Sequence, residues 1–202
     1  MEEFIALLEE RGIPVENVGW AVENRPDEVA AVFTKLESRK VLRRISEGQE
    51  ISVGPTDGQR TIPGATSTFK AGIDGDFARW KVANKPGAPK GATKVVVDEL
   101  VEDATFTEMF GSLSAELDAL VFEGDQVIDI CREHPEWLSK TGWTAFLLKK
   151  EKETEEEKDK DKYFVVSVLV CDPGKLRVNV RHLEYAYVWS AKYGRRIVSP
   201  QL

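Results

Sequence analysis

The sequence predicts an α+β protein made of three successive parts, and three observations predict that order. Apolar residues between Glu2 and Leu36 recur at helical spacing. Residues 54–94 then hold seven glycines and four prolines, a density typical of irregular structure. From Trp143 onward, three strand-like runs follow one another. We therefore expect one domain at 1–53, an irregular connector at 54–94 and an α+β interaction domain at 95–202.

Three helices are expected in the first domain. The first runs from Glu2 to Arg11 and ends at Gly12, and the second covers 15–22. The third has Pro26 in its first turn, where Asp27 and Glu28 favour the positive end of the helix dipole. Its apolar stripe consists of Val29, Val32, Phe33 and Leu36.

A two-stranded hairpin is expected after the third helix. Residues 41–45 alternate with period two, Ser46 to Gln49 supply a turn, and Ile51 to Val53 return as the second strand. The order of elements in residues 2–53 is therefore three helices followed by a hairpin.

This order resembles the winged helix-turn-helix family, over about residues 2–53. The resemblance is carried by four stretches: Phe4–Leu8, Val18–Val22, Arg25–Leu36 and Arg39–Ile45. It implies that the third helix enters the major groove of double-stranded DNA and that the hairpin, the wing, contacts phosphate or the minor groove. Carried over to this chain, the groove-facing residues are Thr34, Lys35, Ser38 and Arg39, and the phosphate contacts are Lys40, Arg43 and Arg44.

One departure from the family opposes DNA binding. The first turn of the third helix presents Asp27 and Glu28, and carboxylates beside phosphate are unfavourable unless one accepts from a cytosine amine. Two other interpretations therefore stand: the module serves protein contacts, or the pattern is simply three core helices.

The connector combines bases with aromatic rings. We considered Arg79, Trp80 and Lys81 as contacts to a nucleic-acid backbone, because positive charge and stacking rings suit that ligand. The alternative, favoured on the rings alone, is a basic linker whose aromatic residues dock on the protein's own core.

The third part is predicted to be two helices on an antiparallel sheet. Thr105 and Glu108 have capping-box spacing, and the second helix spans about 124–133. Strands are expected at 95–97, 143–150, 163–170 and 176–183, with further ones at 185–189 and 195–197. Alternation would put Tyr185, Tyr187 and Trp189 on one face, either as core or as an interface.

The sequence does not indicate catalytic chemistry. Cys131 and His134 have the spacing of half a metal site, but Cys171 and His182 are too loosely spaced to complete it. Phosphate-binding loops, nucleophile elbows and zinc-protease motifs are absent from the sequence. We expect no metal, no cofactor and no enzyme activity.

The net charge of −7 is unevenly distributed. Residues 25–94 carry 13 bases and 8 acids, a net of +5, whereas residues 95–202 carry 14 bases and 21 acids. An acidic N-terminus and the lack of long apolar runs favour a cytoplasmic protein with no membrane contact. The expected function is a DNA-binding regulator that binds itself or another protein through 95–202. The alternative is an assembly or adaptor protein, including the viral or phage kind, that uses both domains for protein contacts.

Overall fold

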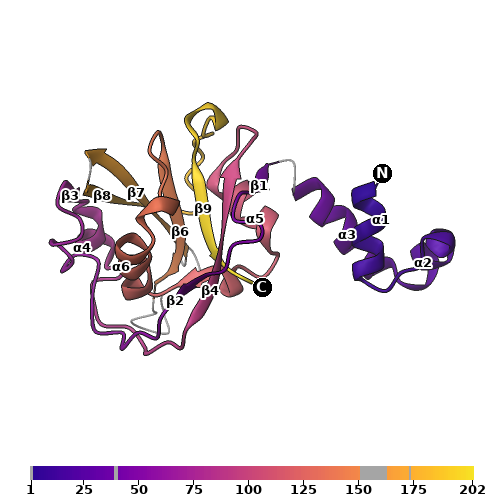
Figure 1. Ribbon diagram of the computed structural model, residues 1–202, viewed down its shortest axis with the longest axis horizontal. Coiled ribbons are helices and arrows are strands. Elements are labelled where there is room, and N and C mark those ends of the chain that lie inside the picture. Colours follow the sequence, from indigo (N-terminus) through magenta and orange to yellow (C-terminus); the bar gives the residue numbers. More distant parts are fainter. Residues whose placement is uncertain (1, 39–40, 151–162, 173) are drawn as a thin grey trace.

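The computed structural model describes residues 2–38, 41–150, 163–172 and 174–202. It has two parts, which we call the three-helix unit (residues 2–38) and the sheet unit (residues 41–202). The three-helix unit extends from one end of the sheet unit, and α3 (Pro26–Ser38) contacts α5 (Phe106–Leu113) where the two meet (Figure 1).

The three-helix unit has its own small core. Its elements are α1 (Glu2–Glu10), a 3-10 turn (Val15–Asn17), α2 (Val18–Asn24) and α3 (Pro26–Ser38). Gly12 has a φ of +64°, the left-handed conformation that commonly follows a helix, so α1 ends where the sequence predicts. The buried residues of this core are Leu7, Leu8, Ile13, Ala21, Val29 and Val32.

A nine-stranded sheet dominates the sheet unit. Its strands are β1 (Leu42–Arg44), β2 (Ile51–Val53), β3 (Gly72–Ile73), β4 (Thr93–Leu100), β5 (Val121–Phe122), β6 (Trp143–Lys149), β7 (Tyr163–Asp172), β8 (Lys175–His182) and β9 (Arg196–Pro200). The main path runs β1-β4-β9-β6-β7-β8-β3. β7 pairs antiparallel with both β6 and β8, but the sheet is mixed and not antiparallel throughout, because β9 and β5 both run parallel to β6 and β3 runs parallel to β8.

The predicted wing hairpin is wrong. β1 and β2 do not pair with each other: Leu42 faces Leu100 and Ile51 faces Val95, so both strands lie antiparallel along the same edge of β4. The physical reason is burial, since an isolated two-stranded hairpin is marginal in water. Pairing with the eight-residue β4 instead buries Leu42 and Ile51 in the cores of the sheet unit.

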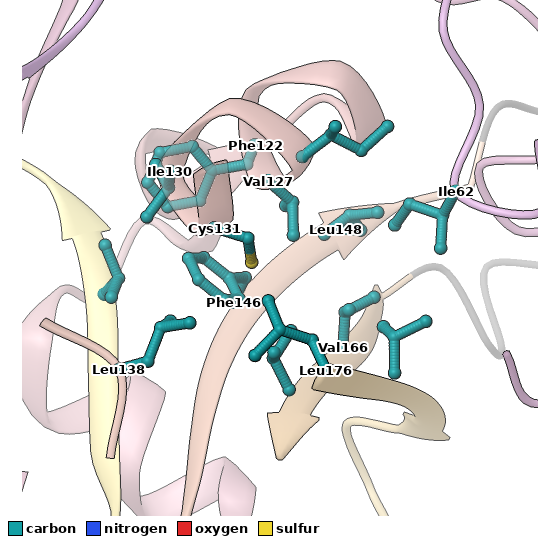
Figure 2. Close-up of a cluster of buried hydrophobic side chains, with 14 of the residues drawn as sticks. Ile62, Phe122, Val127, Ile130, Cys131, Leu138, Phe146, Leu148, Val166 and Leu176 are labelled. Atoms are coloured by element: carbon teal, nitrogen blue, oxygen red, sulfur yellow. The ribbon is translucent and has the colours of Figure 1, made fainter. Parts of the chain in front are cut away.

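Each face of the sheet carries a separate core, in accordance with strand alternation. Alternating residues of β6 place Ala145 and Leu147 on the face covered by α5 (Phe106–Leu113), and Phe146 and Leu148 on the face covered by α6 (Gly124–Glu133). Figure 2 shows the second core, where α6 lies over β6 and Cys131 points toward Phe146. Both predicted helices are present, and Thr105 and Glu108 form the predicted capping box of α5.

The segment predicted to be a connector packs into this second core. It is mostly irregular, and its regular elements are β3, the short α4 (Asp76–Trp80) and the first two residues of β4. Four of its residues are almost completely buried: Ile62, Phe69, Phe77 and Val82. The alternative reading, in which the aromatic residues dock on the protein's own core, is therefore the one that the structure bears out.

The predicted strand at 185–189 is wrong. This stretch is irregular, and the β-bridge between Ala104 and Trp189 is an isolated one that lies outside the strands. The stretch leads through a 3-10 turn (Ala191–Tyr193) into β9, which confirms the last predicted strand. Further 3-10 turns lie at Leu117–Leu120 and Pro135–Trp137.

Candidate interaction surfaces

The structure does not describe the side chains of the predicted groove-facing residues. The backbones of Thr34, Lys35 and Ser38 lie in the C-terminal part of α3, and nothing further is described of them. Arg39 and Lys40 lie outside the described residues. DNA binding through these five positions stays a prediction.

Arg43 and Arg44, the predicted wing residues, are engaged with carboxylates of β4. Arg43 lies 2.9 Å from a carboxylate oxygen of Glu99, and Arg44 donates from Nε to Asp98 at 2.9 Å. The Asp98 side chain is only 5% exposed, so the guanidinium of Arg44 compensates a nearly buried negative charge. These two arginines therefore have a role within the sheet, whatever else they contact.

The three-helix unit presents apolar side chains to solvent. Trp20 and Val22 of α2 are 54% and 50% exposed, and Phe33 of α3 is 51% exposed. Phe33 belongs to the predicted apolar stripe, yet only Val29 and Val32 of its described members reach the core. The ring of Phe33 lies instead against Phe4, with centroids 5.3 Å apart.

Arg79, Trp80 and Lys81 have different neighbours in the structure. Trp80 packs against His182 and Phe164, with ring centroids 4.4 and 6.0 Å apart. The Arg79 side chain is 77% exposed and lies 3.8 Å from Asp76. Lys81 lines a cavity beside α6. Trp80 is therefore a packing residue of the sheet unit, and contact of these three residues with nucleic acid stays a prediction.

A second group of exposed residues, the aromatic surface, consists of Tyr185, Tyr187, Val188 and Tyr193. Their exposed fractions lie between 44% and 55%. The rings of Tyr185 and Tyr187 are stacked, 6.2 Å apart at 15°, and Tyr187 lies 4.6 Å from the ring of Trp189. Sequence alternation indicated this grouping, but not that an irregular segment would hold it.

Trp189 and Arg195 hold the aromatic surface in place. The backbone of Trp189 exchanges two hydrogen bonds with Ala104, of 2.8 and 3.1 Å, and its ring packs 5.3 Å from that of Trp143. The guanidinium of Arg195 lies over Trp143, Trp189 and Tyr193 and donates to the Ser190 carbonyl. Desolvation there lowers the pKa of Arg195. The exposed rings are thus carried on a fixed support.

The cysteines and histidines do not converge on a site. Cys131 is buried in the α6 core, where desolvation raises the pKa of its thiol, whereas Cys171 is exposed at the end of β7. His134 Nε2 lies 2.9 Å from the Ser52 carbonyl, and His182 packs between Trp80 and Phe164. Within the described ranges, His, Cys, Asp and Glu side chains form no group of three that could hold a metal ion.

Comparisons with known proteins do not assign this chain to a family. No protein-family model matches this chain, and neither curated proteins nor solved structures match it. Among the helices that the structure describes, none is long and apolar enough to cross a membrane.

Proposed function

We propose that this chain is an adaptor that brings two partners together, one on each unit. The observation that carries the proposal is the distribution of large apolar side chains on the surface. Nine such residues are exposed in the described part of the chain, and seven fall into two groups. Trp20, Val22 and Phe33 belong to the three-helix unit, and the other four form the aromatic surface.

Exposed aromatic residues favour protein partners. Tyrosine and tryptophan are enriched in protein interfaces and supply much of the binding energy at their centres. The aromatic surface lies beside acidic residues: Asp103 accepts a hydrogen bond from the Ala191 amide, and Glu184 precedes Tyr185. Lys192 and Arg195 lie against the ring of Tyr193, so the charge beside these rings is mixed, and the proposal of a protein partner rests on the exposed rings themselves.

Charge also favours a protein partner for the three-helix unit. Residues 1–38 contain nine acidic and three basic residues, a net of −6. Phosphate contacts dominate the affinity of DNA-binding proteins, so an acidic unit is poorly suited to DNA. A partner with an apolar patch flanked by basic residues would complement this unit.

Site-specific photo-cross-linking tests the proposal. A photoreactive phenylalanine analogue replaces Tyr187 in one variant, Trp20 in a second, and the exposed Lys70 in a control. We expect position 187 and position 20 to give two different protein adducts in the cells that produce the chain, and position 70 to give neither. The adaptor proposal fails if all three positions yield the same adducts, or if DNA is the species captured at position 20.

A further inference from the structure

A surface cavity of about 490 Å³ lies beside the N-terminus of α6 and is lined by five basic residues. These come from three segments that are distant in the sequence: Arg60 from the first, Lys81 and Lys85 from the second, and Lys149 and Lys150 from the end of β6. The lining also contains two carboxylates, Glu123 and Asp125, so its formal charge is +3. The chain as a whole carries −7, which makes this concentration of positive charge a local feature.

Both carboxylates of the cavity are engaged with protein groups. Asp125 accepts a hydrogen bond of 2.7 Å from the amide of Gly58, and Glu123 lies 3.5 Å from the ammonium of Lys90. Glu123 also takes part in the capping box that begins α6. Their negative charges are thus partly compensated, although Oδ1 of Asp125 is buried without a hydrogen-bond partner among the described residues. The helix dipole of α6 adds positive potential at the cavity.

Two of the basic residues are held by acids that are not part of the lining. Arg60 donates to both carboxylate oxygens of Asp129 at 2.5 Å, and Lys149 lies 2.8 Å from Asp118. The hydrogen bonds that Arg60 donates to Asp129 raise the pKa of Arg60 above its usual value, so this residue stays charged. These contacts fix the positions of two cations on opposite segments of the wall.

Two residues in the wall of the cavity have a strained backbone conformation. Lys81 and Ala83, with φ of +56° and +44°, are the two non-glycine residues with positive φ in the described part of the chain, and both line the cavity. Gly58 also has a positive φ. Its backbone lies so close to that of Gly87 that a Cβ at position 58 would lie 2.4 Å from the Gly87 carbonyl oxygen. Backbone strain of this kind often accompanies binding sites.

From this geometry we infer that the basic cavity binds the phosphate groups of a ligand of nucleoside triphosphate size. Its volume lies in the range typical of small-molecule sites, about 300 to 1,000 Å³. Asp129 and Asp118 pair with Arg60 and Lys149 and lower the formal charge of the site from +3 to +1, so the inference rests on the convergence of five cations on one cavity and not on their net charge. Lysine ammonium groups bind phosphate as compact charges that need no fixed planar geometry. The inference is independent of the adaptor proposal, because none of the exposed apolar residues lines the cavity.

Calorimetric titration of the full chain tests this site with three probes: ATP, inorganic tripolyphosphate and a single-stranded oligonucleotide. We expect ATP and tripolyphosphate to bind with a stoichiometry of one and to weaken as salt is raised. Lys81→Gln/Lys85→Gln should lower the affinity for both at least tenfold. The control Lys70→Gln/Lys140→Gln removes the same charge from exposed positions outside the cavity and should change affinity less than twofold.

Three outcomes would overturn the proposal. The first is that neither ATP nor tripolyphosphate, at millimolar concentration, gives heat of binding with the wild-type chain. Circular dichroism checks that both double variants are folded. The second is an equal loss of affinity in the two double variants, which would show that total charge and not the cavity is responsible. The third is binding of the oligonucleotide alone, which would assign the cavity to a nucleic-acid backbone.

Discussion

The guanidinium carbon of Arg195 lies 5.1 Å from the centroid of the Trp189 ring. It lies 4.8 Å from that of Tyr193 and 5.6 Å from that of Trp143, so one cation contacts three rings. A cation over an aromatic face contributes about 0.5 to 2 kcal/mol, more where it is desolvated. Arg195 therefore links the segment that carries the aromatic surface to the sheet.

Replacing Arg195 by methionine keeps most of the apolar stem and removes the charge. We expect Arg195→Met to lower the free energy of unfolding by about 1 to 3 kcal/mol, measured by urea denaturation. Lys192→Met is the control, because Lys192 is exposed and lies over one ring only, 4.7 Å from Tyr193. An exposed lysine of this kind contributes less than about 0.5 kcal/mol. Equal losses in the two variants would contradict the role assigned to Arg195.

Arg43 and Arg44 differ in what their removal leaves behind. Arg44→Ala strands the carboxylate of Asp98, whose side chain is 5% exposed, and should cost about 1 to 3 kcal/mol of unfolding free energy. Arg43→Ala leaves Glu99, which is 26% exposed, and removes a side chain that is itself 67% exposed. Exposed ion pairs contribute about 0 to 1 kcal/mol, so Arg43→Ala should be nearly neutral in the same denaturation experiment.

The same two variants bear on the DNA prediction. If Arg43 and Arg44 contact phosphate, both substitutions weaken duplex binding and reduce its salt dependence. The ion pairs with β4 predict instead that only stability changes, and only for Arg44→Ala. Fluorescence anisotropy with a duplex at low salt distinguishes these results.

The sequence predicted local structure well and tertiary partners poorly. Helical spacing located α1, α3, α5 and α6, because each has an apolar stripe or a cap that acts within a few residues. The alternation of apolar and polar residues predicted β1 and β2, but it does not show which strands pair with each other. Their pairing with β4, some 40 to 60 residues away, is decided by the burial of Leu42 and Ile51.

Sites assembled from distant segments were missed for a related reason. Ile62, Phe69, Phe77 and Val82 are isolated apolar residues without periodicity, so the segment containing them read as a connector. The basic cavity joins residues 60 to 150, and no spacing rule links them. The clusters of Tyr185, Tyr187 and Trp189 were visible in the sequence because they are neighbours along the chain.

The capping box of α5 should make stability depend on pH. Hydrogen bonds from the Thr105 backbone and hydroxyl hold the pKa of Glu108 below its usual 4.5. A carboxylate with a lowered folded-state pKa stabilises the fold above its unfolded pKa and loses that contribution as pH falls through the folded value. Thr105→Ala removes the cap and should cost about 1 kcal/mol at neutral pH.

Thr105→Ala keeps the backbone hydrogen bond to the Glu108 carboxylate and loses the bond from the hydroxyl, so the difference between wild type and variant should narrow as pH falls below the usual 4.5 and Glu108 becomes protonated in both proteins. It should not vanish, since the Thr105 hydroxyl also accepts from the Glu108 amide at 3.3 Å. Denaturation curves at pH 7 and pH 3.5 measure this. A difference that grows in acid would contradict the assignment of the cap.

The two cysteines should react at very different rates. Cys171 is exposed, whereas Cys131 is buried and burial raises the pKa of its thiol, so it holds its proton at neutral pH. A disulfide reagent such as dithionitrobenzoate should titrate one thiol in the native chain and two in denaturant. Cys171→Ser should remove the native reaction. Rapid reaction of two native thiols would show that Cys131 is accessible and would contradict its burial in the core.

The backbones of Gly58 and Gly87 approach so closely that no side chain fits at position 58. Gly58 has a φ of +74°, and an added Cβ would lie 2.4 Å from the Gly87 carbonyl oxygen, which is backbone and has little freedom to move. The amide of Gly87 also donates to the Gly58 carbonyl at 2.8 Å, so a shift of either loop breaks this bond. Gly58→Ala combines left-handed strain of about 1 to 2 kcal/mol with this clash.

We expect Gly58→Ala to lower the free energy of unfolding by about 2 to 3 kcal/mol. Gly54→Ala is the matched control: the φ of Gly54 is not in the left-handed region and nothing lies within 4 Å of its Cβ position. This variant should be neutral within about 0.5 kcal/mol. Because Gly58 and Gly87 both line the basic cavity, Gly58→Ala should also weaken tripolyphosphate binding by displacing the wall, whereas Gly54→Ala should leave it unchanged. Unaltered stability in Gly58→Ala would mean that the two loops are not in contact, and the cavity would lose one of its walls.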